Sequence, residues 1–133
     1  MKRKGSSIII VSDKGQVLLF LRDDIPEITY PNMWDIPGGH VEKGETPEQC
    51  IIREIKEEME IDLYDFQLFS IVEFSDRIEY TYWKRINLNI DDITLHEGQC
   101  LKWFKEEDIK NTVLAYGFNE ILDDFFDQKP FLD

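Results

Sequence analysis

The stretch GGHVEKGETPEQCIIREIKEEMEI, residues 38 to 61, decides how this sequence is interpreted. Thr46 is a good N-cap, Pro47 suits the first turn of a helix, and Gln49 stands three residues after the cap to complete a capping box. The pattern predicts a helix over residues 46 to 60. This helix opens shortly after two adjacent glycines, whose backbone can approach a ligand closely.

One flank of the predicted helix carries Glu54, Glu57 and Glu58, which lie within roughly 100° of one another at the helical period. Like charges at this spacing repel, so helix stability does not explain the grouping. Grouped carboxylates suit Mg²⁺ or Mn²⁺, and Arg53 is placed to hold Glu57 one turn away. An ordinary solvated acidic face is the alternative. The adjoining flank, which is expected to enter the core, consists of Ile51, Ile52, Ile55 and Met59.

Length and composition predict one folded domain over residues 1 to 133, with 42% apolar and 13% aromatic residues. The 28 acidic and 15 basic side chains give a net charge of −13. This balance argues against a nucleic-acid polymer as partner, because binding a phosphate backbone requires a basic face. A small anionic substrate is compatible with the charge, since acidic residues recruit divalent cations that meet phosphate oxygens.

The remaining pattern predicts strands with a few helices between them. The apolar runs at 6–12 and 16–21 flank a tight turn in which Gly15 takes a positive φ. Residues 65–75 and 78–90 alternate with period two and are expected to form neighbouring antiparallel strands. The other expected elements are short strands at 34–36 and 100–104, a helical turn at 106–111 and an amphipathic helix at 117–128. This order predicts an α+β fold with a mixed sheet packed between helices, in αβα layers.

The two cysteines, Cys50 and Cys100, are far apart in the sequence and form no CxxC pair. They therefore suggest neither a disulfide scaffold nor a zinc site, and reduced thiols in a cytoplasmic protein are expected. The basic N-terminus is followed by an apolar run too short for a signal peptide, and no later run is long enough to span a membrane. We expect no membrane partner.

The segment from Gly39 to Ile61 resembles the signature of the Nudix hydrolase family. The matching positions are the glycine, Glu45 after five further residues, the run REIKEEM at 53–59 after seven more, and the apolar closing residue. The preceding NMWDIP and the opening hairpin are also similar to those of family members. The resemblance implies a Nudix-type αβα sandwich that hydrolyses a nucleoside diphosphate linked to another group, X, with Mg²⁺ or Mn²⁺ as cofactor.

The resemblance also implies metal ligands. Glu57 and Glu58 would be the principal ligands, with the Gly38 carbonyl as a further oxygen. Glu54 would be either a ligand or the general base, and we take it as the base because a carboxylate with little metal charge can accept a proton from water. Glu97, in HEGQCLKWF, would be an additional ligand or the alternative base, or else an ordinary turn residue.

Two residues of the signature have supporting roles by resemblance. Arg53 would orient a glutamate in the catalytic group, and Glu45 would support the loop or the metal shell indirectly. One position departs from the family pattern, because Glu60 stands where a glycine is usual. That glycine ends the helix in a left-handed conformation, which glutamate adopts only with strain. The helix is therefore expected either to end differently here or to run longer.

Candidate substrate contacts lie mostly outside the helix. Arg22 resembles a phosphate-contacting arginine, although a surface arginine at a strand end fits as well. Asn119 lies where the MutT-like branch has an asparagine that recognises a purine edge, and it also suits the N-cap of the last helix. Trp34 and Gly39 are candidates for lining the pocket. His40 and His96 are treated as loop residues because hard oxygen ligands are already present.

Two functional hypotheses from different classes follow. The first is a metal-dependent nucleotide pyrophosphatase, MutT-like on nucleoside triphosphates such as oxidised dGTP, with ADP-ribose or a nucleotide sugar as the competing substrate. The second is a non-catalytic nucleotide-binding sensor that keeps the fold. Intact Arg53, Glu54, Glu57 and Glu58 favour the enzyme. The expected partner is a small nucleotide, and both a monomer and a homodimer are compatible with the sequence.

Overall fold

One long strand organises the sheet of this protein, whose computed structural model describes residues 2–132. β1 (Arg3–Val11) pairs in parallel with β6 (Arg77–Arg85) along its whole length and antiparallel with β2 (Val17–Leu21) at the predicted hairpin. Within residues 2–132, seven strands form one mixed sheet in the order β3-β2-β1-β6-β5, with β4 also paired to β1 and β7 to β2. The predicted mixed sheet is confirmed.

The other strands extend this arrangement. Their bounds are Trp34–Asp35 for β3, Gly38–His40 for β4, Gln67–Glu73 for β5 and Cys100–Phe104 for β7. β5 and β6 are antiparallel neighbours as predicted, with an irregularity between Leu68 and Ser70. β6 ends at Arg85, earlier than the predicted 90, and a short 3-10 helix follows at Ile90–Asp92. β4 was not predicted as a strand, because its two glycines carry no strand signal.

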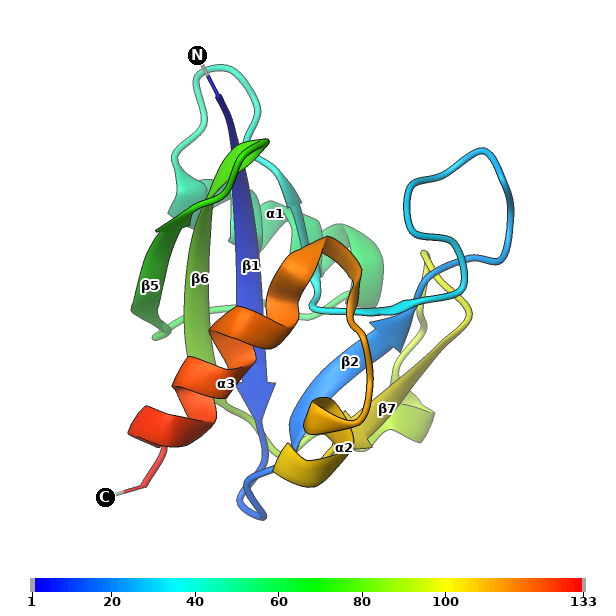
Figure 1. Cartoon of the computed structure of the whole chain (residues 1–133), viewed down its shortest axis with the longest axis vertical. Coiled ribbons are helices and arrows are strands. Elements are labelled where there is room, and N and C mark those ends of the chain that lie inside the picture. Colours follow the sequence, from blue (N-terminus) through cyan, green and yellow to red (C-terminus); the bar gives the residue numbers. More distant parts are fainter. Residues whose placement is uncertain (1, 133) are drawn as a thin grey trace.

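Helices cover both faces of the sheet, so the fold is an αβα sandwich. Figure 1 shows α3 (Phe118–Gln128) and the short α2 (Glu106–Lys110) in front of the sheet and α1 (Pro47–Met59) behind it. One core cluster lies between the sheet and α1 and includes Ile8, Ile10, Ile51, Ile55 and Met59. The other cluster lies between the sheet and α3 and includes Ile9, Val11, Ile121, Leu122 and Phe125. The consecutive apolar residues of β1 are buried because both faces of the strand are covered.

The α1 helix begins as predicted, but the expectation that it would end differently at Glu60 or run longer is wrong. Thr46 is the N-cap and its side chain accepts from the Gln49 amide, while the Gln49 side chain accepts from the Thr46 amide, completing the capping box. The helix ends at Met59, and Glu60 adopts the left-handed conformation with φ 57°. Glutamate thus takes the conformation that a glycine would accept without strain. A second prediction for this helix is also wrong: Ile52 is 42% exposed, because it lies at the edge of the apolar flank.

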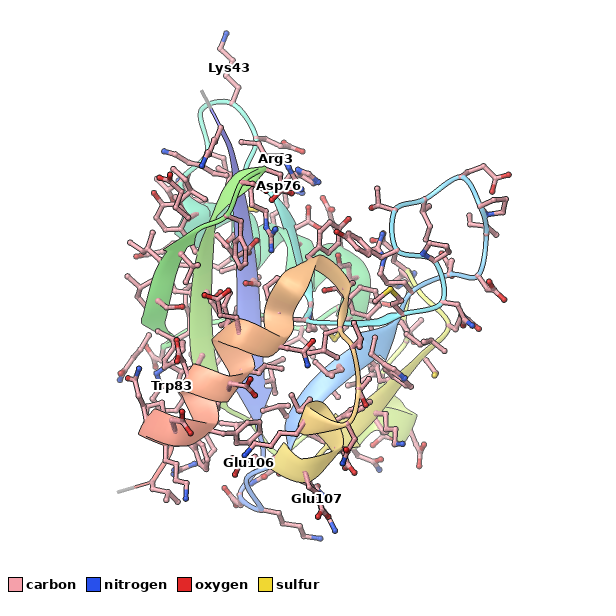
Figure 2. All side chains as sticks on the ribbon, viewed as in Figure 1. Arg3, Lys43, Asp76, Trp83, Glu106 and Glu107 are labelled. Carbon is pink, nitrogen blue, oxygen red and sulfur yellow. The ribbon has the colours of Figure 1, made fainter. Side chains whose placement is uncertain are left out.

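None of the helices in the part of the chain that the structure describes is both long enough and apolar enough to cross a membrane. Charged side chains cover much of the surface. Figure 2 shows Lys43 projecting from the tip of the loop before α1, whereas Arg3 and Asp76 lie close together near the start of β1. The Arg3 Nη2 atom is 3.2 Å from the Asp76 carboxylate. Basic residues at this end of the sheet are therefore partly neutralised by acidic neighbours.

Candidate active site

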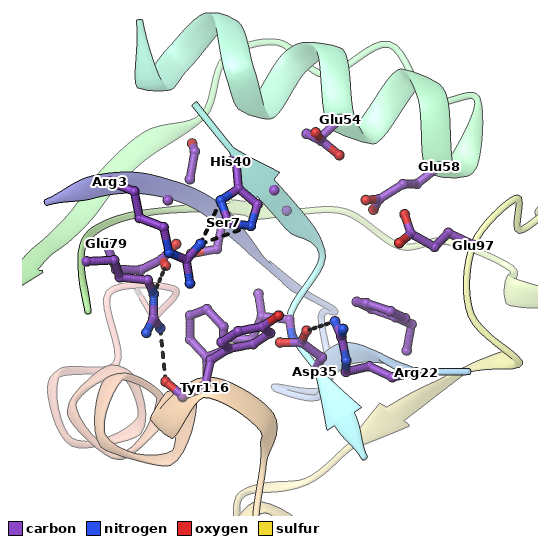
Figure 3. Close-up of a pocket in the computed structure, with 18 of the residues that line it drawn as sticks. Arg3, Ser7, Arg22, Asp35, His40, Glu54, Glu58, Glu79, Glu97 and Tyr116 are labelled. Carbon is purple, nitrogen blue, oxygen red and sulfur yellow. Dashed lines mark hydrogen bonds and ion pairs between the residues drawn. The ribbon is translucent and has the colours of Figure 1, made fainter. Parts of the chain in front are cut away.

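A cavity of about 340 Å³ lies beside β4, between α1 and the turn that leads into α3. Figure 3 shows Glu54 and Glu58 pointing into it from α1 and Glu97 pointing toward Glu58 from the segment before β7. These three carboxylates form what we call the helix end of the cavity. The structure thus brings Glu97 to the two helix residues although about 40 residues separate them in the sequence.

The β4 glycines allow this arrangement. A Cβ atom at Gly38 would lie 2.2 Å from the Ser6 carbonyl oxygen, so only glycine lets β4 pack this closely against β1. A Cβ atom at Gly39 would lie 2.3 Å from the Glu54 carboxyl carbon. The Glu54 carboxylate therefore rests directly against the β4 backbone. The doubled glycine serves close packing, and it leaves backbone groups exposed to the cavity.

Arg53 organises the loop before α1. Its Nε and Nη2 atoms donate to the two carboxylate oxygens of Glu45 at 2.7 and 3.0 Å, which is a bidentate pair. Its Nη1 atom donates to Glu54 at 2.9 Å and to Glu57 at 3.3 Å. The hydrogen bond with Arg53 lowers the pKa of Glu45 to about 2. Arg53 thus fixes both the loop and the Glu54 carboxylate, and it is the nearest positive partner of the acidic helix.

Glu58 lacks such a partner. It is 6% exposed, and no arginine or lysine among residues 2–132 forms an ion pair with it or with Glu97. Burial, the hydrogen bond with Glu54 and the charge of Glu97 raise the pKa of Glu58 well above its usual range. The Glu58 backbone carbonyl accepts from the His96 amide at 2.9 Å, which holds the segment carrying Glu97 against α1. The fold therefore brings two carboxyl groups together without a basic side chain to pair with them.

This arrangement fits a divalent cation. A cation would supply the positive charge that Glu58 and Glu97 lack, and Gly38 and Gly39 of β4 line the same cavity. Within the described range 2–132, no group of three or more acidic, histidine or cysteine side chains is arranged to hold a metal ion by itself. Mg²⁺ does not require one, because it usually keeps several waters and binds through one or two carboxylates plus substrate phosphates.

Glu57 differs from its neighbours on the helix. Its side chain is 60% exposed, pairs with Arg53 and does not line the cavity. The structure therefore does not bring together the three helix glutamates that the sequence pattern grouped. The reason is that Glu57 is turned toward Arg53 and solvent, whereas Glu54 and Glu58 face the sheet. Glu57 would join a metal shell only by leaving Arg53.

The opposite wall of the cavity begins with Arg22. Its Nη1 atom donates to Asp35 at 3.1 Å and its Nε atom to the Thr29 carbonyl at 2.9 Å, while its guanidinium lies 5.2 Å from the Tyr116 ring. Burial raises the pKa of Asp35 to about 7, against the opposing effect of Arg22. Arg22 thus lines the cavity from the end of β2, in a position fixed by three neighbours.

Comparison with known proteins identifies the family. The model of the NUDIX domain matches residues 1–126. The chain belongs to the Nudix family. The 8-oxo-dGTP diphosphatase of Escherichia coli (strain K12) is 46% identical over 85 residues, covering 62% of this chain and 64% of that protein. The RNA pyrophosphohydrolase of a Nitratiruptor species is 30% identical over 91 residues, covering 68% of this chain and 51% of that protein.

The Nudix fold is also found among solved structures. A MutT structure from a study of the Aliivibrio salmonicida and Vibrio cholerae proteins matches with a TM-score of 0.77 and 23% identity, covering 96% of this chain and 99% of that one. This likeness supports the fold, and the predicted MutT-like Nudix resemblance is confirmed. The chain spans less than two thirds of the length of the first curated relatives that it matches.

Two predicted substrate contacts of this Nudix chain lie away from the cavity. Trp34 packs edge-on against Phe104, at a ring distance of 4.9 Å, and does not line the cavity. The Asn119 amide accepts from the Leu114 backbone and donates to the carbonyls of Ile109 and Thr112. It neither lines the cavity nor caps α3, whose N-cap is Gly117. Both side chains therefore contribute to the packing around the cavity and not to its lining.

Sequence reasoning missed several residues of the Nudix cavity. The first is Asp35, which is 4% exposed and was noted only as part of NMWDIP. The others are Arg3, Arg77, Glu79 and Tyr116. The available signal was alternation along β6, which places 77, 79 and 81 on the same face of the strand. Polar residues on that face, in a strand flanked by other strands, indicate a cavity rather than a core.

Proposed function

We propose that this protein is a Mg²⁺-dependent hydrolase, with Mn²⁺ as a substitute, that cleaves a nucleoside diphosphate linked to a group X. The observation that carries the proposal is the helix end of the cavity, where buried Glu58 faces Glu97 and lies next to Glu54 without a protein cation. Stability alone does not favour such a group, because a buried carboxyl without a counter-charge either stays protonated or carries its charge at a cost of several kcal/mol. A bound cation with its phosphate ligand would remove that cost.

The residues take the following roles in this proposal. Glu58, Glu97 and the Gly38 carbonyl would hold the ion, and Glu57 would be an outer contact. When bound, Mg²⁺ neutralises the diphosphate and lowers the pKa of a coordinated water. Glu54 accepts the proton of the attacking water. It suits this role because Arg53, at 2.9 Å, keeps its carboxylate in one position.

Other residues position the substrate and the loop. Arg22 donates to a phosphate oxygen, for which its guanidinium needs only its remaining N–H groups. The β4 backbone at Gly39 admits the diphosphate close to Glu54, because no side chain stands between them. Glu45 acts indirectly by anchoring Arg53. Asn119 and Trp34 have no direct part in this site.

A MutT-like activity on nucleoside triphosphates such as oxidised dGTP is the preferred substrate hypothesis, supported by the 8-oxo-dGTP diphosphatase relative. ADP-ribose and nucleotide sugars are the competing substrates, because the metal site fixes the bond that is cleaved and not the X group. We further propose that the partner is a small nucleotide rather than a nucleic-acid polymer. The protein would act as a monomer or homodimer. The free thiols of Cys50 and Cys100 suit the cytoplasm.

Metal-dependent turnover is the direct test. Purified protein is incubated with Mg²⁺, Mn²⁺ or EDTA and with ordinary and oxidised nucleoside triphosphates, ADP-ribose, nucleotide sugars and dinucleoside polyphosphates, and release of phosphate and pyrophosphate is measured. We expect hydrolysis that EDTA abolishes and added Mg²⁺ restores. Nucleotide binding without turnover in any metal would support the sensor hypothesis. Absence of metal binding by calorimetry would refute the metal site.

A further inference from the structure

The Glu97 carboxylate is placed by the segment that carries it, because it has no partner of its own. This segment runs from the 3-10 helix at Ile90–Asp92 to the start of β7. Figure 3 shows the Glu97 carboxylate turned toward Glu58. As described above, no arginine or lysine among residues 2–132 forms an ion pair with it. The residues on either side of Glu97 must therefore hold it in place.

On the β7 side, Gln99 fixes the segment to the end of β2. Its backbone amide donates to the Leu21 carbonyl at 2.7 Å. Its side-chain amide donates to the Arg22 carbonyl at 2.7 Å and to the Asn32 side chain at 3.0 Å. The chain is thus anchored two residues after Glu97.

On the other side, His96 fixes the segment to the end of α1. Its backbone amide donates to the Glu58 carbonyl at 2.9 Å. Its ring Nε2 atom lies 2.7 Å from the Glu60 Oε2 atom, a contact that we call the clasp. Neither Glu60 nor His96 lines the cavity. Both contacts of His96 therefore act on Glu97 from outside the cavity, through the adjacent backbone.

The conformation of Glu60 is unfavourable for a glutamate. Its φ and ψ of 57° and 34° are left-handed, and a residue with a Cβ atom adopts them only at a cost in free energy that glycine avoids. The clasp does not offset this cost through stability, because its two side chains are 50% and 60% exposed and exposed pairs contribute little. The stability of the fold thus does not explain a glutamate at this position.

A glycine here would end α1 equally well, but it has no side chain that reaches His96. The departure from the Nudix signature at residue 60 and the contact with the Glu97 segment therefore occur at the same residue. Backbone strain that the fold retains at such a place is characteristic of residues that serve a site at some expense of stability. The gain from the glutamate side chain is the second anchor on His96.

We propose that Glu60 is a positioning residue of the metal site: through the clasp it holds His96 on α1 and keeps Glu97 where it can bind a divalent cation together with Glu58. This inference rests on the proposed hydrolase function. It goes beyond that function because it assigns a role in metal binding to a residue that neither touches the metal nor lines the cavity.

The clasp acts by raising the population of the binding-competent segment. Without it, the segment also samples positions in which Glu97 has moved away from Glu58, and the apparent affinity for Mg²⁺ falls in proportion to the competent fraction. For an exposed pair, the expected loss of affinity is about two- to fivefold. Saturating Mg²⁺ should restore kcat, because the proposed ligands and the base are unchanged. The effect thus lies in the Kd and the KM for Mg²⁺.

Three substitutions at residue 60 separate the clasp from the strain. Glu60→Ala removes the clasp and keeps a strained backbone, Glu60→Gly removes both, and Glu60→Gln keeps a hydrogen-bond acceptor for His96. The Kd for Mg²⁺ is measured by calorimetry, and the KM for Mg²⁺ and the melting temperature are measured on the same samples. Ala and Gly should both raise the Kd about two- to fivefold, while Gln should stay close to the unchanged protein.

The glycine variant gives the clearest signature. Glu60→Gly should melt at a higher temperature than the unchanged protein and yet bind Mg²⁺ more weakly. A residue with a merely structural role would change stability and metal binding in the same direction. Opposite changes therefore distinguish positioning from support of the fold.

Two controls address charge and the partner of the clasp. Asp62→Asn removes another exposed acid just after α1, which pairs with Lys56 at 2.8 Å, and should leave the Kd unchanged. His96→Ala should raise the Kd as much as Glu60→Ala does. The double variant should show no further rise, because both single substitutions remove the same contact.

Hydrogen exchange tests the clasp without metal. In EDTA, the His96 backbone amide should exchange about two- to fivefold faster in Glu60→Ala than in the unchanged protein or in Asp62→Asn, because the segment opens more often. An unchanged exchange rate would overturn the clasp as an anchor of this segment.

Other outcomes distinguish this inference from the hydrolase proposal. An equal Kd for Mg²⁺ in Glu60→Ala and in the unchanged protein would overturn the inference and leave the hydrolase proposal intact. Equal losses in Glu60→Gln and Glu60→Ala would do the same, because they would reflect the lost charge and not the lost contact. If the unchanged protein binds no Mg²⁺, the proposed function fails and this inference fails with it.

Discussion

The buried carboxylates at the two ends of the cavity differ in whether a basic side chain compensates their charge. Away from the helix end, Glu79 pairs with Arg77 at 2.6 Å and Asp35 pairs with Arg22 at 3.1 Å. At the helix end, Glu58 is equally buried and has no arginine or lysine partner among the described residues. A carboxylate with its own counter-ion keeps its shape and recognises neutral polar groups. A buried carboxylate without one must bind either a proton or an external cation. Within one cavity, the paired carboxylates therefore suit recognition of the substrate, and the unpaired carboxylate suits the metal-dependent reaction.

The largest expected effect tests the helix end. Glu58→Gln should lower kcat by about a thousandfold and abolish Mg²⁺ binding by calorimetry, because metal-ion catalysis contributes several kcal/mol. Its metal-free melting temperature should be unchanged or higher, since a neutral amide replaces a buried carboxyl. Glu57→Gln on the same helix is the matched variant, and its loss should be about tenfold or less, because Glu57 is exposed and paired with Arg53. Equal losses in the two variants would contradict the distinction between them.

A smaller effect is expected on the pH dependence of metal-free stability. The pKa of Glu58 is raised, and that of Asp35 is raised from 3.8 to about 7, in both cases first by burial. The folded protein therefore holds protons that the unfolded chain has released above about pH 4. This contribution is complete below the unfolded pKa values and is lost as pH rises through the folded ones. The melting temperature should fall from pH 5 to pH 9 in EDTA.

Metal should oppose this trend. Mg²⁺ binds the deprotonated carboxylates, so excess Mg²⁺ should raise the melting temperature more at pH 9 than at pH 5. The melting temperature of Glu58→Gln should depend less on pH in EDTA and respond little to Mg²⁺. The contribution of Asp35 to the pH dependence should remain. Calorimetric melting curves at several pH values measure both effects. A melting temperature that rises steadily from pH 5 to pH 9 without metal would contradict the unpaired carboxylate.

The smallest effect concerns the end of α1, which positions Glu97. Glu60→Gly should relieve the left-handed strain at φ 57° and, after the entropy that glycine gains in the unfolded chain, stabilise the protein by about 0.5 kcal/mol, or about 2 °C. It also removes the contact between Glu60 and His96 at 2.7 Å, so the KM for Mg²⁺ should rise slightly. Lys129→Gly, at the left-handed end of α3, should stabilise similarly without changing that KM. An unchanged or lower melting temperature in both variants would argue against strain.

The sequence predicted the elements well where local signals are strong. The capping box fixed the start of α1 at Pro47, and Gly15 has the expected positive φ of 74° in the opening hairpin. The prediction was wrong at Ile52, which lies at the margin of the apolar flank, and the strand β4 was missed. β4 forms because β1 lacks bulky side chains opposite it, with Gly5 and Ser6 at the pairing positions. That condition is set by a distant segment and has no local signal.

The site was predicted only in part, because some of its contacts are likewise set by distant segments. Residues one helix turn apart, such as Arg53 and Glu57, share a contact that helical spacing alone implies, and this pair forms the expected interaction. Glu97 was found through family resemblance. The roles suggested for Asn119 and Trp34 depended on where their side chains point, and tertiary packing directs Asn119 to backbone groups and Trp34 to Phe104. Glu79 was missed because its importance depends on the Gly5 and Arg77 beside it.

The sequence by itself determined the family, the layered fold, the acidic helix and the glycines that precede it, because each rests on short-range spacing or on a contiguous motif. Only the tertiary structure decided which carboxylates share a space and which find a counter-charge. Glu57 and Glu58 are adjacent in the sequence, yet one meets Arg53 and water and the other meets Glu97 in a buried cavity. The physical reason is that desolvation and pairing depend on the distant segments that cover a residue.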